Sequence, residues 1–255
     1  MPYAIDFPVG NTGHPPPPRL YGALYANLLK WFEAADAELA EALHERPVRK
    51  PFTISALIRD RDGRWRWRVT LLQDGLFDAL WTGVQAVGMI RLNGRTWPVR
   101  WQDARIVHCS YRLLLTNVYP MDSIKLRFLS PTALRKDKMD FPLPDPSKVF
   151  EGWLNHWNEF APAQYCISTD LLEVVQACVA ISAHQIRARE YDLGSTQIKG
   201  FVGRVIYRIL NARKLNQAHV WQLNALADYA EFCGTGRKTT HGLGQTRRLR
   251  HGRRQ

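Results

Sequence analysis

Two runs of alternating side chains, separated by a tight-turn signal, determine the structure expected for residues 52 to 69. Every second residue is apolar in both runs, at positions 52, 54, 56 and 58 and again at 65, 67 and 69. This period of two is typical of β-strands, and Asp62-Gly63 between the runs favours a two-residue turn. The segment therefore predicts an antiparallel β-hairpin.

Helical periodicity flanks this hairpin. Leucine or phenylalanine recurs at positions 20, 24, 28 and 32, and the pattern continues towards His44 with a break near Ala34 to Asp36. We expect a second helix over Gly75 to Val87, a strand over Tyr3 to Val9 and strands across Met89 to Leu115. The first half thus has the element order βαββαβ.

The second half shows the same order of predicted elements. They are a strand over Ile124 to Leu129, a helix over Val149 to Trp157, β-rich runs over Val174 to Ile186 and Thr196 to Leu210, a helix over Ala218 to Phe232 and a last strand near Thr240 to Leu249. Ser130 to Pro146 contains four prolines and is expected to be a surface loop. We predict an α+β protein of two tandem βαββαβ domains, residues 1–120 and 121–255.

The charge of the chain limits the class of partner. Thirty-five Lys and Arg residues against 23 Asp and Glu residues give a net charge of +12, which favours a polyanion, nucleic acid before membrane. The N-terminus has no basic start or long apolar run, and no stretch approaches the ~20 apolar residues of a membrane span, so we expect a cytoplasmic protein without a membrane partner. Its four cysteines are widely spaced and form no CxxC pair. Neither a metal site nor a cofactor is predicted.

The segment Gly234 to Gly244, GTGRKTTHGLG, is the most specific motif of the chain. It has four glycines in eleven residues, which let backbone N–H groups approach a phosphate closely. It is neither a Rossmann fingerprint nor a P-loop, because the third glycine of the first and the Gly-Lys-Ser/Thr of the second are missing. From this segment to the C-terminus the chain has seven Lys and Arg residues and no acid. We predict RNA binding by Gly234, Gly236, Arg237, Lys238, His241, Gly242, Gly244, Arg247 and Arg248; a basic tail that only aids solubility is the alternative.

Phe232 to Gln245, FCGTGRKTTHGLGQ, resembles the C-terminal glycine-rich loop of the CRISPR repeat-processing endoribonucleases of the RAMP superfamily. Phe128 to Thr132, FLSPT, and Lys199 to Gly203, KGFVG, are similar to other segments of that family. The resemblance covers the second half well, and in the first half it extends to Leu43-His-Glu45 and Lys50 to Ser55. It implies two ferredoxin-like domains, the first with the catalytic residues and the second with the glycine-rich RNA-binding loop. It also implies CRISPR repeat RNA as the partner, possible association with effector-complex subunits, and cleavage of precursor transcripts.

The resemblance further implies a metal-independent active site of His44, Lys50 and Tyr25. In this chemistry a base takes the proton of a ribose 2′-OH, an acid protonates the departing 5′-oxygen, and a cation stabilises the charge between these steps. Histidine can take either proton-transfer role, since its reference pKa is about 6.5. The products would be a 2′,3′-cyclic phosphate and a 5′-hydroxyl.

Each of these assignments has an alternative. His44 could contact the last carbonyls of its helix, Lys50 could be an ordinary solvated cation, and Tyr25 could serve in core packing. Should His44 not be the catalytic residue, His14 is the next candidate.

Arg64, Arg66 and Arg68 lie on one face of the predicted hairpin and could follow a phosphate backbone. A solvated sheet face, partly neutralised by neighbouring aspartates, is the alternative.

The sequence leaves three functions to consider. The first two are a repeat-cleaving ribonuclease and a non-catalytic RNA-binding subunit of a CRISPR effector complex. A basic nucleic-acid-binding protein unrelated to CRISPR is the third.

Overall fold

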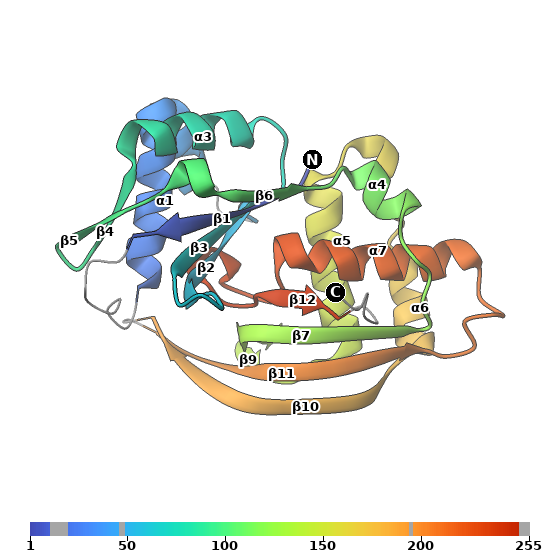
Figure 1. Ribbon diagram of the computed structural model, residues 1–255. Coiled ribbons are helices and arrows are strands. Elements are labelled where there is room, and N and C mark those ends of the chain that lie inside the picture. Colours follow the sequence, from blue (N-terminus) through green and yellow to red (C-terminus); the bar gives the residue numbers. More distant parts are fainter. Residues whose placement is uncertain (11–19, 46–48, 194–195, 250–255) are drawn as a thin grey trace. The chain divides into compact units, whose positions relative to one another are not determined.

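A computed structural model describes residues 1–10, 20–45, 49–193 and 196–249 of the chain (Figure 1). The chain divides into two compact units: unit 1 is Met1–Cys109 with Leu193–Ser195 and Thr240–Gly242, and unit 2 is the rest. The division falls eleven residues before the expected boundary, because helix α4 (Tyr111–Thr116) packs on helix α7 (Gln217–Cys233) of unit 2.

Unit 1 is built on a four-stranded antiparallel sheet in the order β2-β3-β1-β6. Its strands are β1 (Tyr3–Val9), β2 (Phe52–Arg59), β3 (Trp65–Leu71) and β6 (Arg105–His108), and its helices are α1 (Tyr21–Ala35), α2 (Ala37–Glu45) and α3 (Leu76–Val87). A small hairpin, β4 (Met89–Leu92) and β5 (Arg95–Pro98), and the 3-10 turn η1 (Trp101–Asp103) lie between α3 and β6. The first and third strands of the βαββαβ motif are therefore central, as in a ferredoxin-like domain.

Most of the apolar residues predicted by the periodicities form the core of unit 1, but a register shift between Ile54 and Leu57 buries Leu57 and leaves Ile58 48% exposed. Trp67 is fully buried, with its ring centroid 5.0 Å from that of Trp31 on α1, and Phe7 of β1 packs edge-on against Trp31. The break expected near Ala34 to Asp36 is confirmed, since Asp36 separates α1 from α2. The hairpin of β2 and β3 is confirmed as well, but its strands are joined by the five residues 60 to 64 and not by a two-residue turn.

Unit 2 repeats the arrangement, with sheet order β10-β11-β7-β12. Its strands are β7 (Ser123–Thr132), β10 (Val179–Asp192), β11 (Gln197–Ile209) and β12 (Thr246–Arg248), and its further helices are α5 (Pro146–Phe160) and α6 (Leu171–Cys178). Short elements complete it: β8 (Leu134–Lys136), β9 (Met139–Phe141), and the 3-10 turns η2 (Ala163–Tyr165) and η3 (Thr239–His241). Two ferredoxin-like domains in tandem are thus confirmed.

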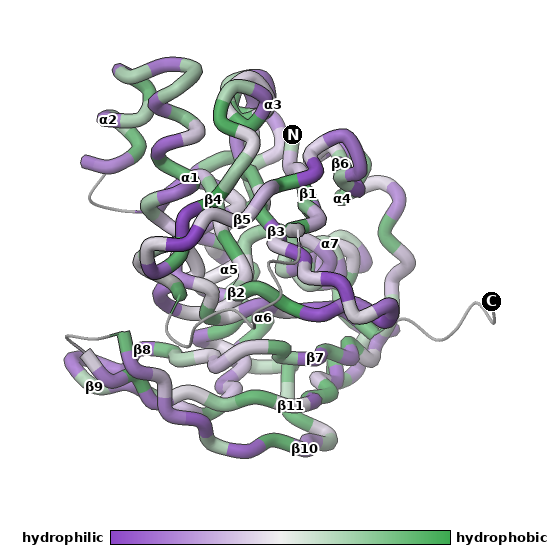
Figure 2. Tube along the Cα trace, turned by 60° about the vertical axis from the view of Figure 1, so that its left-hand side comes forward, coloured by the Kyte–Doolittle hydropathy of each residue, from purple (hydrophilic) through white to green (hydrophobic). Residues whose placement is uncertain are grey.

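The two faces of the unit 2 sheet differ in chemistry. Helices α5, α6 and α7 lie on one side of it (Figure 1), where Leu126, Phe128 and Val205 are buried. Side chains at alternate positions face the other way, and among them Arg127 and Arg204 are exposed. Figure 2 shows hydrophilic residues recurring along these strands. We call this second side the open face.

Several expected strands and loops are different in the structure. Tyr111–Thr116 is a helix, with the Ser110 hydroxyl accepting a hydrogen bond from the Leu113 amide (3.1 Å), where a strand was expected to extend to Leu115. The run expected from Val174 begins as helix α6, because Leu171 and Val175 bury one side of a helical turn.

The proline-rich segment, expected to be a surface loop, contains the hairpin of β8 and β9. The last strand is shorter than expected: it was predicted near residues 240 to 249 and is limited to Thr246–Arg248. None of the described helices is long and apolar enough to cross a bilayer.

Candidate active site and nucleic-acid interface

His44 and Lys50 lie together at the C-terminal end of helix α2, but they have different contacts. The Lys50 ammonium donates hydrogen bonds to the backbone carbonyls of Leu43 (2.6 Å) and His44 (2.7 Å). A cation at this end of a helix satisfies its last carbonyls and interacts favourably with its dipole. Lys50 therefore takes the capping role that was the alternative for His44. The exposed His44 imidazole has no hydrogen bond to a residue in the described ranges.

Tyr25, one helix away on α1, brings a phenol next to this histidine. Its ring centroid lies 6.4 Å from that of His44 and 6.0 Å from that of Phe52. Partial burial raises the pKa of Tyr25 above its usual value. The phenol is therefore protonated at neutral pH and can donate a hydrogen bond, whereas it is a poor base.

His241, predicted to contact RNA, lies in the same cluster. Residues Thr240–Gly242 belong to unit 1, and the imidazole of His241 stacks on Tyr25 with ring centroids 5.2 Å apart and an angle of 14° between the planes. The Thr240 hydroxyl and His241 Nδ1 lie 2.9 Å apart, within hydrogen-bonding distance. Tyr25 thus lies near two imidazoles, from residues almost 200 positions apart in the sequence. We call His44, Tyr25 and His241 the aromatic cluster.

His14, the next candidate for the catalytic histidine, lies outside the described residues. In the described part of the chain, no group of three or more His, Cys, Asp and Glu side chains could hold a metal ion.

The glycine-rich loop forms hydrogen bonds within the protein. The amide of Arg237 donates to the carbonyl of Ala133 (3.0 Å), and the amide of Gly244 donates to that of Pro131 (3.0 Å). Gly236 has φ +79°, and a Cβ there would lie 2.3 Å from the Ala133 oxygen. Gly236 is therefore required by the close approach of the loop to Ala133, just after β7, and the N–H groups of Arg237 and Gly244 are not directed at a phosphate.

The basic residues of the C-terminal segment have different environments. Arg237 pairs with Asp140 (2.6 Å), Lys238 is exposed with φ +59°, and Arg247 is exposed on β12. Arg248 is buried, with 6% of its side chain exposed, and its guanidinium pairs with Asp228 at 2.9 Å. Lys238 and Arg247 are thus accessible to RNA, whereas Arg248 is part of the interior.

The arginine row of the unit 1 hairpin is largely neutralised. Arg68 makes a two-pronged ion pair with Asp6 (2.7 and 2.8 Å), and Arg66 pairs with Asp60 (2.7 Å). Hydrogen bonds from Arg66 and the Arg64 amide lower the pKa of Asp60, which keeps this carboxylate charged. Of the three, Arg64 has an exposed side chain and forms no ion pair with a described residue. The neighbouring-aspartate alternative thus holds for two of the three arginines.

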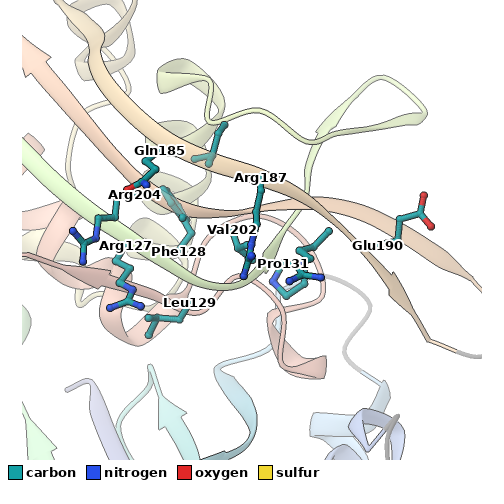
Figure 3. Close-up of a pocket in the computed structure, with 12 residues that line it drawn as sticks. Arg127, Phe128, Leu129, Pro131, Gln185, Arg187, Glu190, Val202 and Arg204 are labelled. Atoms are coloured by element: carbon teal, nitrogen blue, oxygen red, sulfur yellow. The ribbon is translucent and has the colours of Figure 1, made fainter.

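A hollow of about 830 Å³ on the open face of unit 2 contains arginines that the sequence analysis did not select (Figure 3). Arg127 comes from β7, Arg204 from β11, and Arg187 and Arg189 from β10; Leu129, Pro131 and Val202 supply apolar surface between them. In Figure 3 the side chains of Arg127 and Arg204 lie beside each other. The alternation of Lys125 and Arg127 with buried Ile124 and Leu126 was the available signal for an exposed basic strand face.

A protein-family model and several solved structures are similar to this chain. The family model "CRISPR-associated endoribonuclease Cas6" matches residues 126–246, a little under half of the chain. No curated protein sequence matches the chain.

Solved structures match over nearly the whole length. A Thermus thermophilus Cas6 product complex superposes with a TM-score of 0.84 at 23% identity, covering 98% of this chain and 100% of that one. A second Cas6, also solved as a product complex, gives 0.79 at 26% identity over 98% and 100% of the two chains. A Cas6-related protein from Pyrococcus furiosus gives 0.68 at 13% identity, over 99% and 100%. The chain thus has the two-domain ferredoxin-like fold of these Cas6 structures, and its second half, residues 126–246, is similar to the Cas6 endoribonuclease family.

Proposed function

We propose that this protein cleaves CRISPR repeat RNA within precursor transcripts, by attack of a ribose 2′-OH on the adjacent phosphorus. The observation that carries the proposal is the exposed His44 imidazole next to Tyr25 and His241, in a chain whose structural relatives were solved with product and with a substrate mimic. A further matched structure is of a histidine-to-alanine mutant of Cas6.

The residues of the aromatic cluster divide the chemistry as follows. One imidazole takes the 2′-OH proton while the O2′–P bond forms, and the other gives a proton to the 5′-oxygen as the P–O5′ bond breaks. His44 is the exposed member and takes one of these roles; His241 supplies the second imidazole. Tyr25, as a neutral phenol, donates a hydrogen bond that orients the reacting ribose or phosphate. The step consumes no water and leaves a 2′,3′-cyclic phosphate and a 5′-hydroxyl.

Lys50 has a different role in this scheme from the one first expected. Its two hydrogen bonds to the α2 carbonyls fix its ammonium beside the backbone of His44. It therefore positions the helix end that carries the histidine, and contributes positive potential rather than a direct phosphate contact. Substitution Lys50→Met would then affect His44 through the helix end.

The test is cleavage of the repeat RNA by the wild type and by His44→Ala, with His219→Ala as a control histidine at the start of α7. Removal of a general acid or base typically costs 10² to 10⁴ in rate, so we expect His44→Ala to slow the single-turnover rate by about that factor while still binding RNA. His219→Ala should cut at the wild-type rate. A wild type that binds the repeat and never cuts it would replace this proposal with the non-catalytic subunit.

A further inference from the structure

We infer that the open face of unit 2 binds the phosphate backbone of RNA without reading its bases, through a row of three arginines. The inference rests on the proposed function for its ligand class and specifies which surface supplies affinity independent of sequence. The row consists of Arg247, Arg127 and Arg204, on three neighbouring strands.

The strand register places these three side chains next to each other. Arg247 of β12 pairs directly with Arg127 of β7, and Arg127 pairs directly with Arg204 of β11. Directly paired residues project to the same face, and neighbouring strands lie about 4.8 Å apart, so the row extends over roughly 10 Å. Gln185 of β10 pairs with Arg204 and continues the row with a neutral amide.

No acid among the described residues forms an ion pair with this row. Arg187 and Arg189 add two further charges to the hollow. Its one acidic lining residue, Glu190, pairs with Lys199 at 3.3 Å. Like charges directly opposite each other destabilise a sheet. Bound phosphates would relieve this repulsion.

On the described central strands, the same face has no exposed aromatic side chain on which a base could stack. RNA-binding sheets that recognise single strands stack bases on exposed aromatic rings. On the central strands β7 and β11 the aromatic residues are Phe128, Phe201 and Tyr207, and each is at most 2% exposed. The open-face positions hold instead lysine, arginine or aliphatic residues: Lys125, Arg127, Leu129, Val202, Arg204, Ile206 and Arg208. The open face of the described central strands thus presents positive charges that can bind phosphates, and it has no exposed aromatic ring for base stacking.

The experiment measures the salt dependence of RNA binding. Dissociation constants are determined over a range of salt concentrations for the repeat RNA and for an RNA of scrambled sequence, with the wild type and the variant Arg127→Gln/Arg204→Gln/Arg247→Gln. Each lost phosphate contact lowers the slope of log K against log salt by about 0.7 to 0.9. For three contacts we expect the slope to fall by about 2 to 3, and by the same amount for both RNAs.

A matched pair of single variants locates the effect. Arg204 and Arg208 lie on the same strand and face, but Arg208 already pairs with Asp122 at 3.0 Å. Arg204→Gln should lower the slope by about 0.7 to 0.9 and Arg208→Gln should leave it unchanged.

Three results would overturn the inference: an unchanged slope in the triple variant, a loss confined to the repeat RNA, or equal losses for Arg204→Gln and Arg208→Gln. Wild-type cleavage is measured separately. Binding that follows the prediction without any cleavage would therefore contradict the proposed function and leave this inference intact.

Discussion

Replacing Arg248 by methionine should destabilise unit 2, although the residue lies in the most basic segment of the chain. Its guanidinium donates to Asp228 (2.9 Å) and to the backbone carbonyl of Asn224 (2.9 Å), and it also contacts the side-chain oxygen of Asn224. The side chains of Arg248 and Asp228 are 6% and 9% exposed. Methionine keeps the length of the side chain but removes every donor and the charge.

The size of the effect follows from the burial of the pair. Removing one member of a buried ion pair typically costs about 3 to 5 kcal/mol, because the remaining charge is left in the interior without its partner. For a protein of this size, each kcal/mol lowers the melting temperature by about 2 to 4 °C, so a decrease on the order of 10 °C is expected. Asp228→Asn in the Arg248→Met background should recover part of this loss, since it removes the unpaired charge.

The neighbouring arginine provides the control. Arg247 is exposed on the opposite face of the same strand, so Arg247→Met should change the free energy of unfolding by no more than about 0.5 kcal/mol. Both variants are compared by urea and thermal unfolding. Equal destabilisation by the two substitutions, or a fully stable Arg248→Met protein, would refute the assignment of Arg248 to the interior.

Two further predictions concern the glycine-rich loop and its flanking cysteine. Gly236→Ala should lower the free energy of unfolding by at least about 2 kcal/mol, because an L-residue is strained at φ +79° and its Cβ would approach the Ala133 carbonyl. Gly152→Ala, at an unobstructed helical position of α5, should instead raise it by about 0.5 to 1 kcal/mol. Thermal melting of both variants tests this difference. Burial raises the pKa of the Cys233 thiol well above its usual value, so iodoacetamide at pH 8 should modify exposed Cys166 and leave Cys233 unmodified in the folded protein, as peptide mass mapping would show. As the pH rises, the thiol ionises in the unfolded chain before it ionises in the folded protein. The contribution of Cys233 to the free energy of unfolding is therefore complete below its unfolded pKa of about 8.5 and is lost as the pH rises above that value. Modification of Cys233 at the same rate as Cys166 would contradict its burial.

The fold was predictable from the sequence because its signals are local. The alternation around Asp62-Gly63 and the four-residue period before His44 identified strands and helices of unit 1, and the βαββαβ order defined the sheet topology of both units. The errors arose where tertiary packing overrides local preference. Val174 and Val175 are β-branched residues typical of strands, yet they lie in helix α6, where Val175 is buried.

The candidate site was less predictable because it depends on contacts between distant segments. The sequence selected His44 and Tyr25 by resemblance, but the stacking of His241 on Tyr25 joins residues that no local pattern relates. The arginine row of unit 2 depends on strand register, which the sequence does not specify. The opposite environments of Arg247 and Arg248 were accessible in principle, since consecutive residues of a strand face opposite sides of the sheet.

The central claim is that the ribose 2′-OH of the repeat RNA is the nucleophile and that protein side chains perform the proton transfers. The most direct test uses two repeat RNAs in EDTA, one all-ribose and one with a single 2′-deoxy nucleotide immediately 5′ of the cleaved phosphate. The account predicts that the first is cut to a 2′,3′-cyclic phosphate and a 5′-hydroxyl, and that the second is bound with similar affinity and not cut. Cleavage of the deoxy-substituted RNA at the same position, or cleavage that requires added metal, would contradict it.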